Sequence, residues 1–361
     1  MTRAIGIDPG TVSIDLCGLE DGALVLDCSL PTAVALADPA ALIALLERDA
    51  TPDCIAGPSG YGLPVTAADA ATDEELRLAF LAAPGESGGI GGLRALARAL
   101  AASGLPVVFT PGVIHLPSVP AHRKLNRVDL GTADKVCAAA LGIVEQARRE
   151  ECPLSAVSFV LLELGGAFTA ALAVDGGRIV DGAGGSAGPM GIRAPGALDA
   201  EVAFLAGTIP KSLVFGGGAA AVWGDEQVTP ERFGEPRTAR EHVAFDAYVE
   251  GAVKAVATML TSVPAPREIL LSGRVAGVDA VREAIIGQLA AHVQAPVRTL
   301  AGFATVAKHA AQGAALIADG LAGGTQRPLV ETLGIREASG TVLDHLYVIA
   351  PSTARRRLGL T

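Results

Sequence analysis

Residues 4–11 read Ala-Ile-Gly-Ile-Asp-Pro-Gly-Thr, and this stretch decides how the rest of the chain is interpreted. The apolar run predicts a short buried strand that ends in an acidic residue, a tight Pro-Gly turn and a hydroxyl group. Such a turn can bind phosphate, because glycine lets backbone N–H groups approach the oxygens while the carboxylate holds the water shell of a metal ion. The same residues also suit an ordinary hairpin turn.

A second copy of the pattern favours the phosphate interpretation. Residues 159–166 read Phe-Val-Leu-Leu-Glu-Leu-Gly-Gly and are followed by the hydroxyl of Thr169. The strand after each turn ends in its own hairpin, at Asp21-Gly22 in the first copy and at Asp175-Gly176 in the second. An internal repeat of this kind predicts two similar halves that face each other. Between them a nucleoside triphosphate and its Mg²⁺ could be clamped.

Composition bounds the class of protein and its partners. The 361 residues suffice for two domains with real cores, and the hydrophobic half of them contains few aromatic residues, which is typical of an α/β core covered by helices. A net charge of −10, from 28 basic and 38 acidic residues, argues against a nucleic-acid partner. The sequence contains no Gly-x-x-x-x-Gly-Lys-Ser/Thr motif, so a P-loop is excluded.

The remaining composition indicates a cytoplasmic protein. Its five cysteines are scattered and form no Cys-x-x-Cys motif, which is typical of reduced cysteines used in packing. The six histidines form no ligand pair at helical spacing, so we expect no zinc site. No apolar run approaches the length of a membrane span, and no signal-type segment follows Arg3. We therefore expect no membrane partner.

The order of predicted elements divides the chain into two domains, residues 1–152 and 153–361, with the boundary at the Cys152-Pro153 step. We predict strands within 4–30 and near 53–57, 105–110, 157–163, 167–174, 177–181, 212–215 and 268–271. We predict helices near 39–48, 93–103, 132–150, 198–206, 240–261, 278–292 and 306–318. Residues 72–92 are expected to form a polar, Gly-rich insertion, whose first residues, Thr-Asp-Glu-Glu, resemble a helix cap. The last forty residues, with a strand-like run at 346–349, could return to the first domain.

A third glycine element follows the strand predicted at 268–271. Residues 272–277 read Ser-Gly-Arg-Val-Ala-Gly and precede a predicted helix, so their turn would suit a purine and its ribose. An ordinary loop between a strand and a helix is the alternative. Residues 182–187 loosely resemble a dinucleotide-binding pattern, but the sequence after them does not open a helix, so we assign no such site there.

In this order the motifs resemble those of the acetate and sugar kinase, heat-shock chaperone and actin superfamily. The resemblance rests on the glycine turns after Asp8, Glu163 and Ser272, on the Ala-rich helix at 132–145 and on a second Ala/Gly helix at 306–318. It covers most of the chain. The implied fold is α/β, with two ribonuclease H-like (actin-like ATPase) domains and ATP in a central cleft.

Within this superfamily the sequence is most similar to predicted butyrate kinases, over residues 58–64, 110–117 and 122–135. Residues 188–199 resemble the acetate kinase segment whose arginine stabilises the transferred phosphoryl group, which implies that role for Arg193. Three positions depart from the acetate kinase pattern: Asp8 replaces an asparagine, Glu163 a histidine and Ile192 a threonine. These departures leave the geometry of metal and substrate open.

The resemblance implies the following nucleotide contacts. Mg²⁺ would be bound by Asp8, with Glu163 as a second or water-mediated partner. Gly273 and Arg274 would lie near the nucleoside. The residues expected to contact the phosphates are Gly10, Thr11, Gly165, Gly166 and Thr169. Gly216 and Gly217 either approach the nucleotide or only permit a tight bend.

The segment 123–135 carries four cations and two carboxylates directly before a predicted helix. A carboxylate acceptor would pair with Arg123 or Arg127. A hydroxyl acceptor would instead need Asp129 or Asp134 as its base. The alternative is a capped helix start with surface ion pairs, in which Lys135 is solvated.

Two further residues could line the acceptor pocket. Tyr61 could contact the acceptor or be a packing anchor in its Gly/Pro loop, and Asn126 could donate to the substrate or only within its loop. The function predicted from all of these features is a kinase of a short carboxylate. A kinase of a sugar-like hydroxyl and a slow ATP-binding regulatory or assembly protein are the alternatives. A small molecule is the expected partner, and a homodimer is left open.

Overall fold

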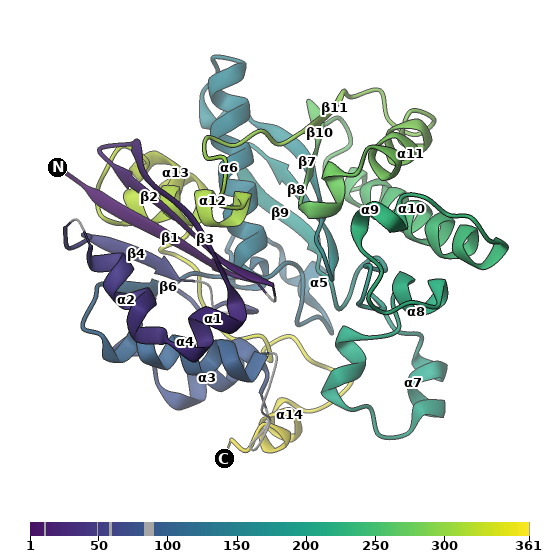
Figure 1. Ribbon diagram of the computed structural model, residues 1–361, viewed down its shortest axis with the longest axis horizontal. Coiled ribbons are helices and arrows are strands. Elements are labelled where there is room, and N and C mark those ends of the chain that lie inside the picture. Colours follow the sequence, from purple (N-terminus) through teal and green to yellow (C-terminus); the bar gives the residue numbers. More distant parts are fainter. Residues whose placement is uncertain (11, 49, 58–59, 83–89, 361) are drawn as a thin grey trace.

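The computed structural model describes residues 1–10, 12–48, 50–57, 60–82 and 90–360, with the side chains of residues 90–93 excepted. Two β-sheets lie side by side, and helices cover both faces of each (Figure 1). The sheets are formed by segments far apart in the sequence, the first by residues 3–109 and the second by residues 158–299.

The first sheet has the order β3-β2-β1-β4-β6-β5. Its strands are β1 (Arg3–Pro9), β2 (Ser13–Glu20), β3 (Ala23–Pro31), β4 (Cys54–Gly57), β5 (Thr66–Ala67) and β6 (Val107–Phe109). The first three strands form an antiparallel meander, whereas β4 and β6 run parallel to β1. The interior of β1 is buried without alternation, which is expected of a central strand with both faces covered.

The second sheet repeats this arrangement with the order β11-β10-β7-β8-β9. Its strands are β7 (Ser158–Leu164), β8 (Thr169–Asp175), β9 (Arg178–Ala183), β10 (Glu268–Ser272) and β11 (Val297–Thr299). Again three strands form an antiparallel meander, and β10 and β11 run parallel to the first of them. The predicted repeat is therefore confirmed, with β7 equivalent to β1.

Helices complete a layered arrangement around the two sheets (Figure 1). Outside the first sheet α2 (Pro39–Glu47), α3 (Asp73–Phe80) and α4 (Ile90–Ala102) enclose one core. Outside the second sheet α10 (Ala239–Leu260) and α11 (Asp279–Leu289) enclose another. Between the sheets lie α6 (Ala133–Arg149) and α12 (His309–Leu321), which pack against each other in a core shared by both halves.

The contacts of α6 and α12 are unusually close because small residues meet there. A Cβ atom on Gly313 of α12 would lie 1.7 Å from the carbonyl oxygen of Cys137 in α6. One on Gly6 of β1 would lie 2.2 Å from the carbonyl oxygen of Ala311. Thus α12, although late in the sequence, packs directly on the first sheet, and backbone lies on backbone at both contacts.

The remaining helices are short, and several connect the halves. They are α1 (Thr32–Ala37), α5 (Ala121–Lys124), α7 (Ala200–Ala206), α8 (Ala219–Trp223), α9 (Pro230–Phe233), α13 (Arg327–Leu333) and α14 (Pro351–Arg357). After α14, the carbonyl of Leu358 accepts a hydrogen bond of 3.2 Å from Arg77 of α3. The domain boundary at residue 152 stays a prediction. None of the helices in the described ranges is both long and apolar enough to pass through a lipid bilayer.

Three predicted elements are wrong. Residues 211–215 form a 3₁₀ turn, because Pro210 and three glycines bound a run that has no neighbouring strand. The run at 346–349 is irregular, and its backbone bonds to a side chain instead of a strand. The expected polar insertion contains α3, whose capping box of Thr72 and Glu75 begins a helix with a buried apolar face. Residues 83–89 of that insertion lie outside the described residues.

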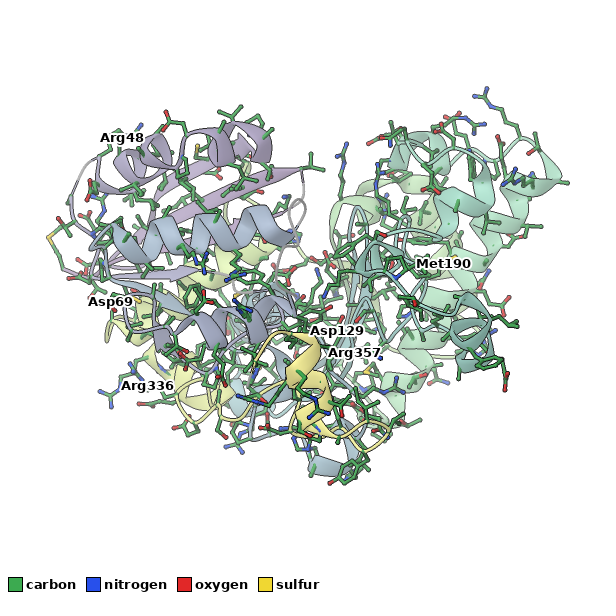
Figure 2. The ribbon with its side chains drawn as sticks, turned by 90° about the horizontal axis from the view of Figure 1, so that it is seen from below. Arg48, Asp69, Asp129, Met190, Arg336 and Arg357 are labelled. Atoms are coloured by element: carbon green, nitrogen blue, oxygen red, sulfur yellow. The ribbon has the colours of Figure 1, made fainter. Side chains whose placement is uncertain are left out.

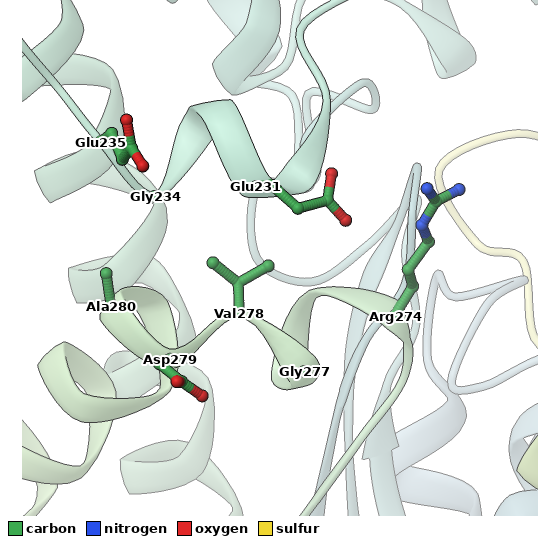
Figure 3. Close-up of a pocket in the computed structure, with 8 residues that line it drawn as sticks. All are labelled: Glu231, Gly234, Glu235, Arg274, Gly277, Val278, Asp279 and Ala280. Atoms are coloured by element: carbon green, nitrogen blue, oxygen red, sulfur yellow. The ribbon is translucent and has the colours of Figure 1, made fainter.

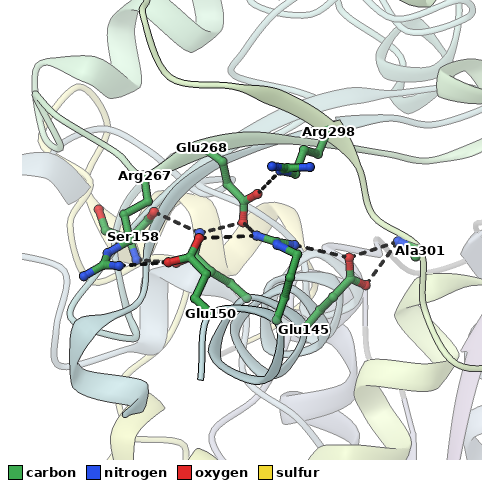
Figure 4. A network of polar contacts seen from close by, with 9 residues as sticks. Glu145, Glu150, Ser158, Arg267, Glu268, Arg298 and Ala301 are labelled. Carbon is green, nitrogen blue, oxygen red and sulfur yellow. Dashed lines mark hydrogen bonds and ion pairs between the residues drawn. The ribbon is translucent and has the colours of Figure 1, made fainter. Parts of the chain in front are cut away.

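A buried polar network crosses the second sheet at the start of β10 (Figure 4). Glu268 is fully buried, and its Oε1 accepts hydrogen bonds from Gln146 and Arg149 of α6. Its Oε2 lies 3.4 Å from Nε of Arg298 in β11. Gln146 also accepts a hydrogen bond of 2.8 Å from the backbone N–H of Ser158 in β7, so the network connects α6 to β7 as well as to β10. We call Glu268, Gln146, Arg149 and Arg298 the Glu268 network.

Candidate active site

Two carboxylates occupy equivalent positions in the two halves. Asp8 is the last residue but one of β1, and Glu163 is the last but one of β7. Asp8 is only 8% exposed. Glu163 pairs in register with Ser272, so the glycine turn that follows β10 reaches the same place. A Cβ atom on Gly273 would lie 2.8 Å from Oε1 of Glu163, and φ there is +90°.

The start of α6 adds a lysine and a third carboxylate. Lys135 Nζ lies 2.7 Å from Oδ2 of Asp134 and 2.8 Å from Oε2 of Glu163. The hydroxyl of Thr132 also donates to Asp134. Burial alone would lower the pKa of Lys135, but the two carboxylates raise that pKa well above its usual range, so the ammonium stays charged. Sequence analysis considered Lys135 only as a solvated cation.

Carboxylates outnumber the cations in this cluster. Burial, together with the neighbouring Asp134, raises the pKa of Asp8 to about 7 against the opposing charges of Lys308 and Lys135. Burial also raises the pKa of Glu163, with Lys135 opposing. For Asp134, Lys135 outweighs burial and lowers the pKa. A buried site with this surplus of negative charge favours binding of a further cation.

The donor set fits Mg²⁺ of the kind that is bound together with phosphates. Within the described ranges, His, Cys, Asp and Glu side chains form no group of three or more that could enclose a metal ion. Magnesium at a nucleotide site is typically held by one or two carboxylates, with water and phosphate oxygens completing its shell. Asp8 and Glu163 can supply such ligands.

The two predicted phosphate turns adjoin these carboxylates. In the first, the N–H of Gly10 donates to the carbonyl of Ser13 at 2.8 Å, whereas Thr11 lies outside the described residues. In the second, the N–H of Gly165 donates to the carbonyl of Phe168 at 2.9 Å, and the space beside Gly166 is open.

Thr169 is placed differently from expectation. Its side chain is fully buried, and its hydroxyl donates to the hydroxyl of Tyr248 in α10 at 3.4 Å. It is the first residue of β8, and this hydrogen bond directs its hydroxyl toward α10. This placement does not support the predicted phosphate contact.

Arg193 and the glycines after residue 215 meet at the second turn. The N–H of Arg193 donates to the carbonyl of Ala167 at 3.1 Å, and the N–H of Gly218 donates to the carbonyl of Arg193 at 2.8 Å. The Phe215 ring packs edge-on against Phe168, with 5.5 Å between centroids. The guanidinium of Arg193 donates to the carbonyl of Glu226 at 2.8 Å. Thus residues 193 and 215–218 adjoin the turn, and Gly217, with φ of +85°, allows a tight bend.

Arg274 lines a cavity of about 500 Å³ between α9 and the start of α11 (Figure 3). Figure 3 shows Glu231 and Arg274 extending from opposite walls toward the same space. The cavity is bounded by Glu231, Gly234, Glu235, Arg274, Gly277, Val278, Asp279 and Ala280. Its three carboxylates could accept hydrogen bonds from a base or from ribose hydroxyls, but they would repel phosphate.

Asp129 lies where the two halves meet (Figure 2). Its Oδ2 accepts from the N–H and the hydroxyl of Ser186 at 2.9 and 3.0 Å, and its Oδ1 accepts from the N–H of Gly131. Burial raises its pKa against these hydrogen bonds. Asp129 therefore joins two loops, with both oxygens engaged. Asp134, whose side chain is 28% exposed, is the more accessible of the two predicted bases.

Tyr61 is buried close to this junction and contacts the second half. The Nζ of Lys211 lies 5.6 Å from the centroid of the Tyr61 ring and donates to the carbonyl of Leu81 at 3.1 Å. A lysine beside carbonyls at the end of α3 is stabilised by the helix dipole. Tyr61 is thus part of a contact between the halves, and this contact is compatible with its role as a packing anchor.

Arg123 and Arg127 line a second cavity, of about 460 Å³, between α5, β9 and α10. Arg123 donates to the carbonyl of Val180 at 2.7 Å and lies 3.6 Å from Asp181, whereas Arg127 is exposed. Asn126, with φ of +54°, accepts from the backbone N–H groups of Tyr347 and Val348. It thereby holds the C-terminal segment, and it does not line this cavity.

Four residues near the strand ends were not predicted from the sequence: Ser13, Asp15, Lys308 and His309. Lys308 forms an ion pair of 2.7 Å with Asp15 and a hydrogen bond with Ser13. The hydroxyl of Ser272 lies 2.8 Å from Nδ1 of His309, which immediately follows Lys308. The only available signal was the position of Lys308 and His309 at the start of a helix that had been noted for its Ala and Gly content.

Solved structures with a similar fold include kinases. The propionate kinase of Francisella tularensis subsp. tularensis SCHU S4 is 11% identical over 87% of this chain and 99% of its own, with a TM-score of 0.61. The acetate kinase of Porphyromonas gingivalis is 14% identical over 79% and 86%, with a TM-score of 0.55. A Listeria monocytogenes protein provisionally assigned as an N-acetylmannosamine kinase is 13% identical over 91% and 99%, with a TM-score of 0.53.

At these identities the likeness concerns the fold alone. It confirms the fold of the acetate and sugar kinase, heat-shock chaperone and actin superfamily, whereas the closer resemblance to butyrate kinases stays a prediction. No curated protein matches the sequence. A family model with the description "Protein of unknown function (DUF1464)" matches residues 6–348, and the chain therefore belongs to that family.

Proposed function

We propose that the protein is a Mg-ATP-dependent kinase of a small molecule. One observation carries the proposal: Asp8 and Glu163 stand at equivalent strand ends of a duplicated fold, each followed by a glycine turn, with Lys135 bonded to Glu163. Phosphoryl transfer depends on positioning and on neutralising charge, and this arrangement supplies groups for both. The kinases among the similar folds give further support.

In this proposal Mg²⁺ is held by Asp8, with Glu163 as its second or water-mediated partner, and it neutralises charge on the phosphates. Thr11 and Gly166 would offer backbone N–H groups to the phosphates, whereas the N–H groups of Gly10 and Gly165 already bond within their turns, so these two glycines would only let the phosphates approach the backbone closely. The nucleoside occupies the cavity beside Arg274, where Glu231, Glu235 and Asp279 suit a base or ribose. The phosphates then point past Gly273 toward Glu163, because the carboxylates of the cavity repel them.

The acceptor that we favour is a short carboxylate. Arg123, Arg127 and Lys254 line a cavity with Asp129 and Asp181, and most of its other lining residues are Gly, Ala, Pro and Met. Because Asp181 already pairs with Arg123, Arg127 is the cation that we propose for an anion with a small apolar body. Arg193 is proposed as the cation that stabilises the transferred phosphoryl group, because its backbone adjoins the second turn. For this role its side chain must leave the carbonyl of Glu226.

A hydroxyl acceptor is the second candidate, favoured by one observation. Asp134 is partly exposed beside Asp8, and Lys135 lowers its pKa, so it is an ionised carboxylate able to orient a hydroxyl group. In this case Asp134, and not Asp129, is the base that we propose.

Trapping with hydroxylamine separates the two acceptors. Enzyme, Mg-ATP and hydroxylamine are incubated with acetate, propionate or butyrate, and an acyl hydroxamate is measured against a control without the acid. A carboxylate kinase yields hydroxamate in proportion to ADP. The absence of hydroxamate with every short acid, together with ADP formed in the presence of a polyol, would assign the hydroxyl acceptor.

The variant R193A tests the third candidate, an ATP-binding regulatory or assembly protein. If Arg193 acts on the transition state, its loss lowers kcat about a hundredfold while the ATP affinity changes little. R327A is the matched control, since Arg327 is an exposed cation of α13 paired with Glu331. Turnover of R193A equal to that of wild type would favour the regulatory protein.

A further inference from the structure

The loop that leads into α12 is fastened to the first sheet. Both carboxylate oxygens of Asp27 in β3 accept hydrogen bonds of 2.6–3.1 Å from the backbone N–H groups of residues 305–307. Within the loop, Oε1 of Gln312 accepts from the N–H groups of Phe303 and Ala304. These bonds fix residues 303–307, so the next residue, Lys308, is presented at a defined place.

The ammonium group of Lys308 is anchored on one side only. Its Nζ lies 2.7 Å from Oδ2 of Asp15 and 2.7 Å from the hydroxyl of Ser13, which itself donates to Asp15 at 2.8 Å. The Asp15 side chain is 2% exposed, whereas that of Lys308 is 43% exposed. The rigid anchor is thus buried and the charge that it holds remains accessible.

Lys308 also adjoins the first phosphate turn and the carboxylate next to it. A Cβ atom on Gly10 would lie only 3.0 Å from Nζ, and Asp15 stands directly opposite Asp8 in the register of β1 and β2. The other cation of the cluster, Lys135, is shared between two carboxylates, whereas Lys308 has one. The charge of Lys308 is therefore less neutralised by neighbouring carboxylates than that of Lys135, and it can attract an anionic ligand more strongly.

We propose that Lys308 binds the terminal phosphate of the nucleotide at the first turn, and that Asp15 and Ser13 position it there. An ammonium group on a flexible stem is a common phosphate ligand, and a fixed carboxylate behind it limits its motion. This inference deepens the proposed function and depends on it, because without a bound nucleotide Lys308 has no phosphate to contact.

The test compares nucleotides of different length. The affinities of Mg-ATP, Mg-ADP and AMP are measured by calorimetry on the full chain for wild type, K308M, K308R and D15N, with R327M as a control cation. K308M is expected to lower the ATP affinity about tenfold to a hundredfold, as for the loss of a charged hydrogen bond, and to leave AMP unchanged. K308R keeps the charge and is expected to stay within a few-fold of wild type. D15N is expected to fall between K308R and K308M for ATP.

The outcomes separate the two claims. A wild type that binds no ATP overturns the proposed function and this inference with it. A wild type that binds ATP, with K308M binding it equally well or losing ATP and AMP affinity to the same extent, overturns the role of Lys308 alone. Thermal unfolding without nucleotide checks the fold of each variant. If K308M does not fold, D15N becomes the deciding variant. If D15N then binds all three nucleotides as tightly as wild type, the positioning of Lys308 by Asp15 is overturned.

Discussion

The Glu268 network, at the start of β10, and the cluster around Asp8, at the ends of β1 and β7, are both buried groups of charges, and they differ in how their carboxylates are paired. Oε1 of Glu268 accepts hydrogen bonds from Gln146 and Arg149, and Oε2 lies 3.4 Å from Arg298 without a hydrogen bond from the described residues, so one carboxylate has two cations beside it. Asp8 receives no hydrogen bond on its carboxylate from the described residues, and Lys135 must serve both Asp134 and Glu163.

This difference favours a role in stability for the Glu268 network and a role in ligand binding for the cluster around Asp8. A fully paired buried charge fastens neighbouring elements, and removing one partner leaves the others uncompensated. A cluster with surplus carboxylates costs stability unless a ligand supplies positive charge, and such perturbed groups gather at functional sites. The same residue types therefore serve different purposes, and their partners decide which.

The largest expected effect is that of D8N, which removes the surplus charge. We expect kcat to fall about a hundredfold to a thousandfold, because the variant loses a metal ligand at the phosphates. The unfolding free energy at pH 8 should not fall, since a buried carboxylate beside Asp134 is replaced by a neutral amide. Steady-state kinetics and urea denaturation measure the two quantities, and a D8N enzyme as active as wild type would contradict the assignment.

E268Q should show the reverse pattern. We expect the unfolding free energy to fall by about 2 kcal/mol, because the charged hydrogen bond between Arg149 and Glu268 is lost, whereas Arg149 keeps its ion pairs with Glu145 and Glu150. The kcat of the folded fraction should match that of wild type. Denaturation at several temperatures with parallel assays checks both, and a loss of activity at full stability would show that the two clusters are coupled.

His115 is a buried titratable group outside both clusters, and the unfolding free energy of H115N measured as a function of pH extends the comparison to it. Burial lowers the pKa of His115 to about 4, below the ordinary value of 6.5. The unfolded chain therefore binds more protons between these values, and wild-type stability is lost as pH falls through this window. From pH 7 to pH 5 the loss attributable to His115 is about 2 kcal/mol. The unfolding free energy of H115N should therefore fall less between pH 7 and pH 5 than that of wild type. An equal fall in both proteins would contradict this contribution of His115.

The smallest effect is expected for R298A, at the exposed edge of the Glu268 network. Arg298 is more than half exposed and lies 3.4 Å from Glu268, so its loss should cost less than about 1 kcal/mol. The same denaturation experiment as for E268Q gives the value. If R298A loses as much unfolding free energy as E268Q, then Arg298 at the exposed edge contributes as much to stability as the buried Glu268, contrary to this prediction.

The fold could be predicted because its signals are local. The Asp-Pro-Gly and Leu-Gly-Gly turns and the Asp-Gly hairpins fix the two meanders, and each lies within about twenty residues of sequence. The failures have local causes too. The run at 212–215 has β-forming residues but no neighbouring strand, and the capping box at Thr72 was noted without the helix that it begins.

The site could be predicted only in part, because its pairings are long-range. Asp8, Glu163 and Asp134 were identified from their motifs, and the structure brings them into one cluster. The ion pair of Lys308 with Asp15 joins residues almost three hundred positions apart, and no spacing rule indicates it. Likewise, nothing in the sequence showed that the backbone N–H and the hydroxyl of Ser186 would both donate to Oδ2 of Asp129.

The two glycine contacts of α12 have a consequence for the spacing of the halves. At Gly313 no side chain separates α12 from α6, and at Gly6 none separates α12 from β1, so this helix lies directly on backbone at both contacts. A methyl group at either glycine would meet a backbone carbonyl oxygen, and α12 would have to move away from that neighbour.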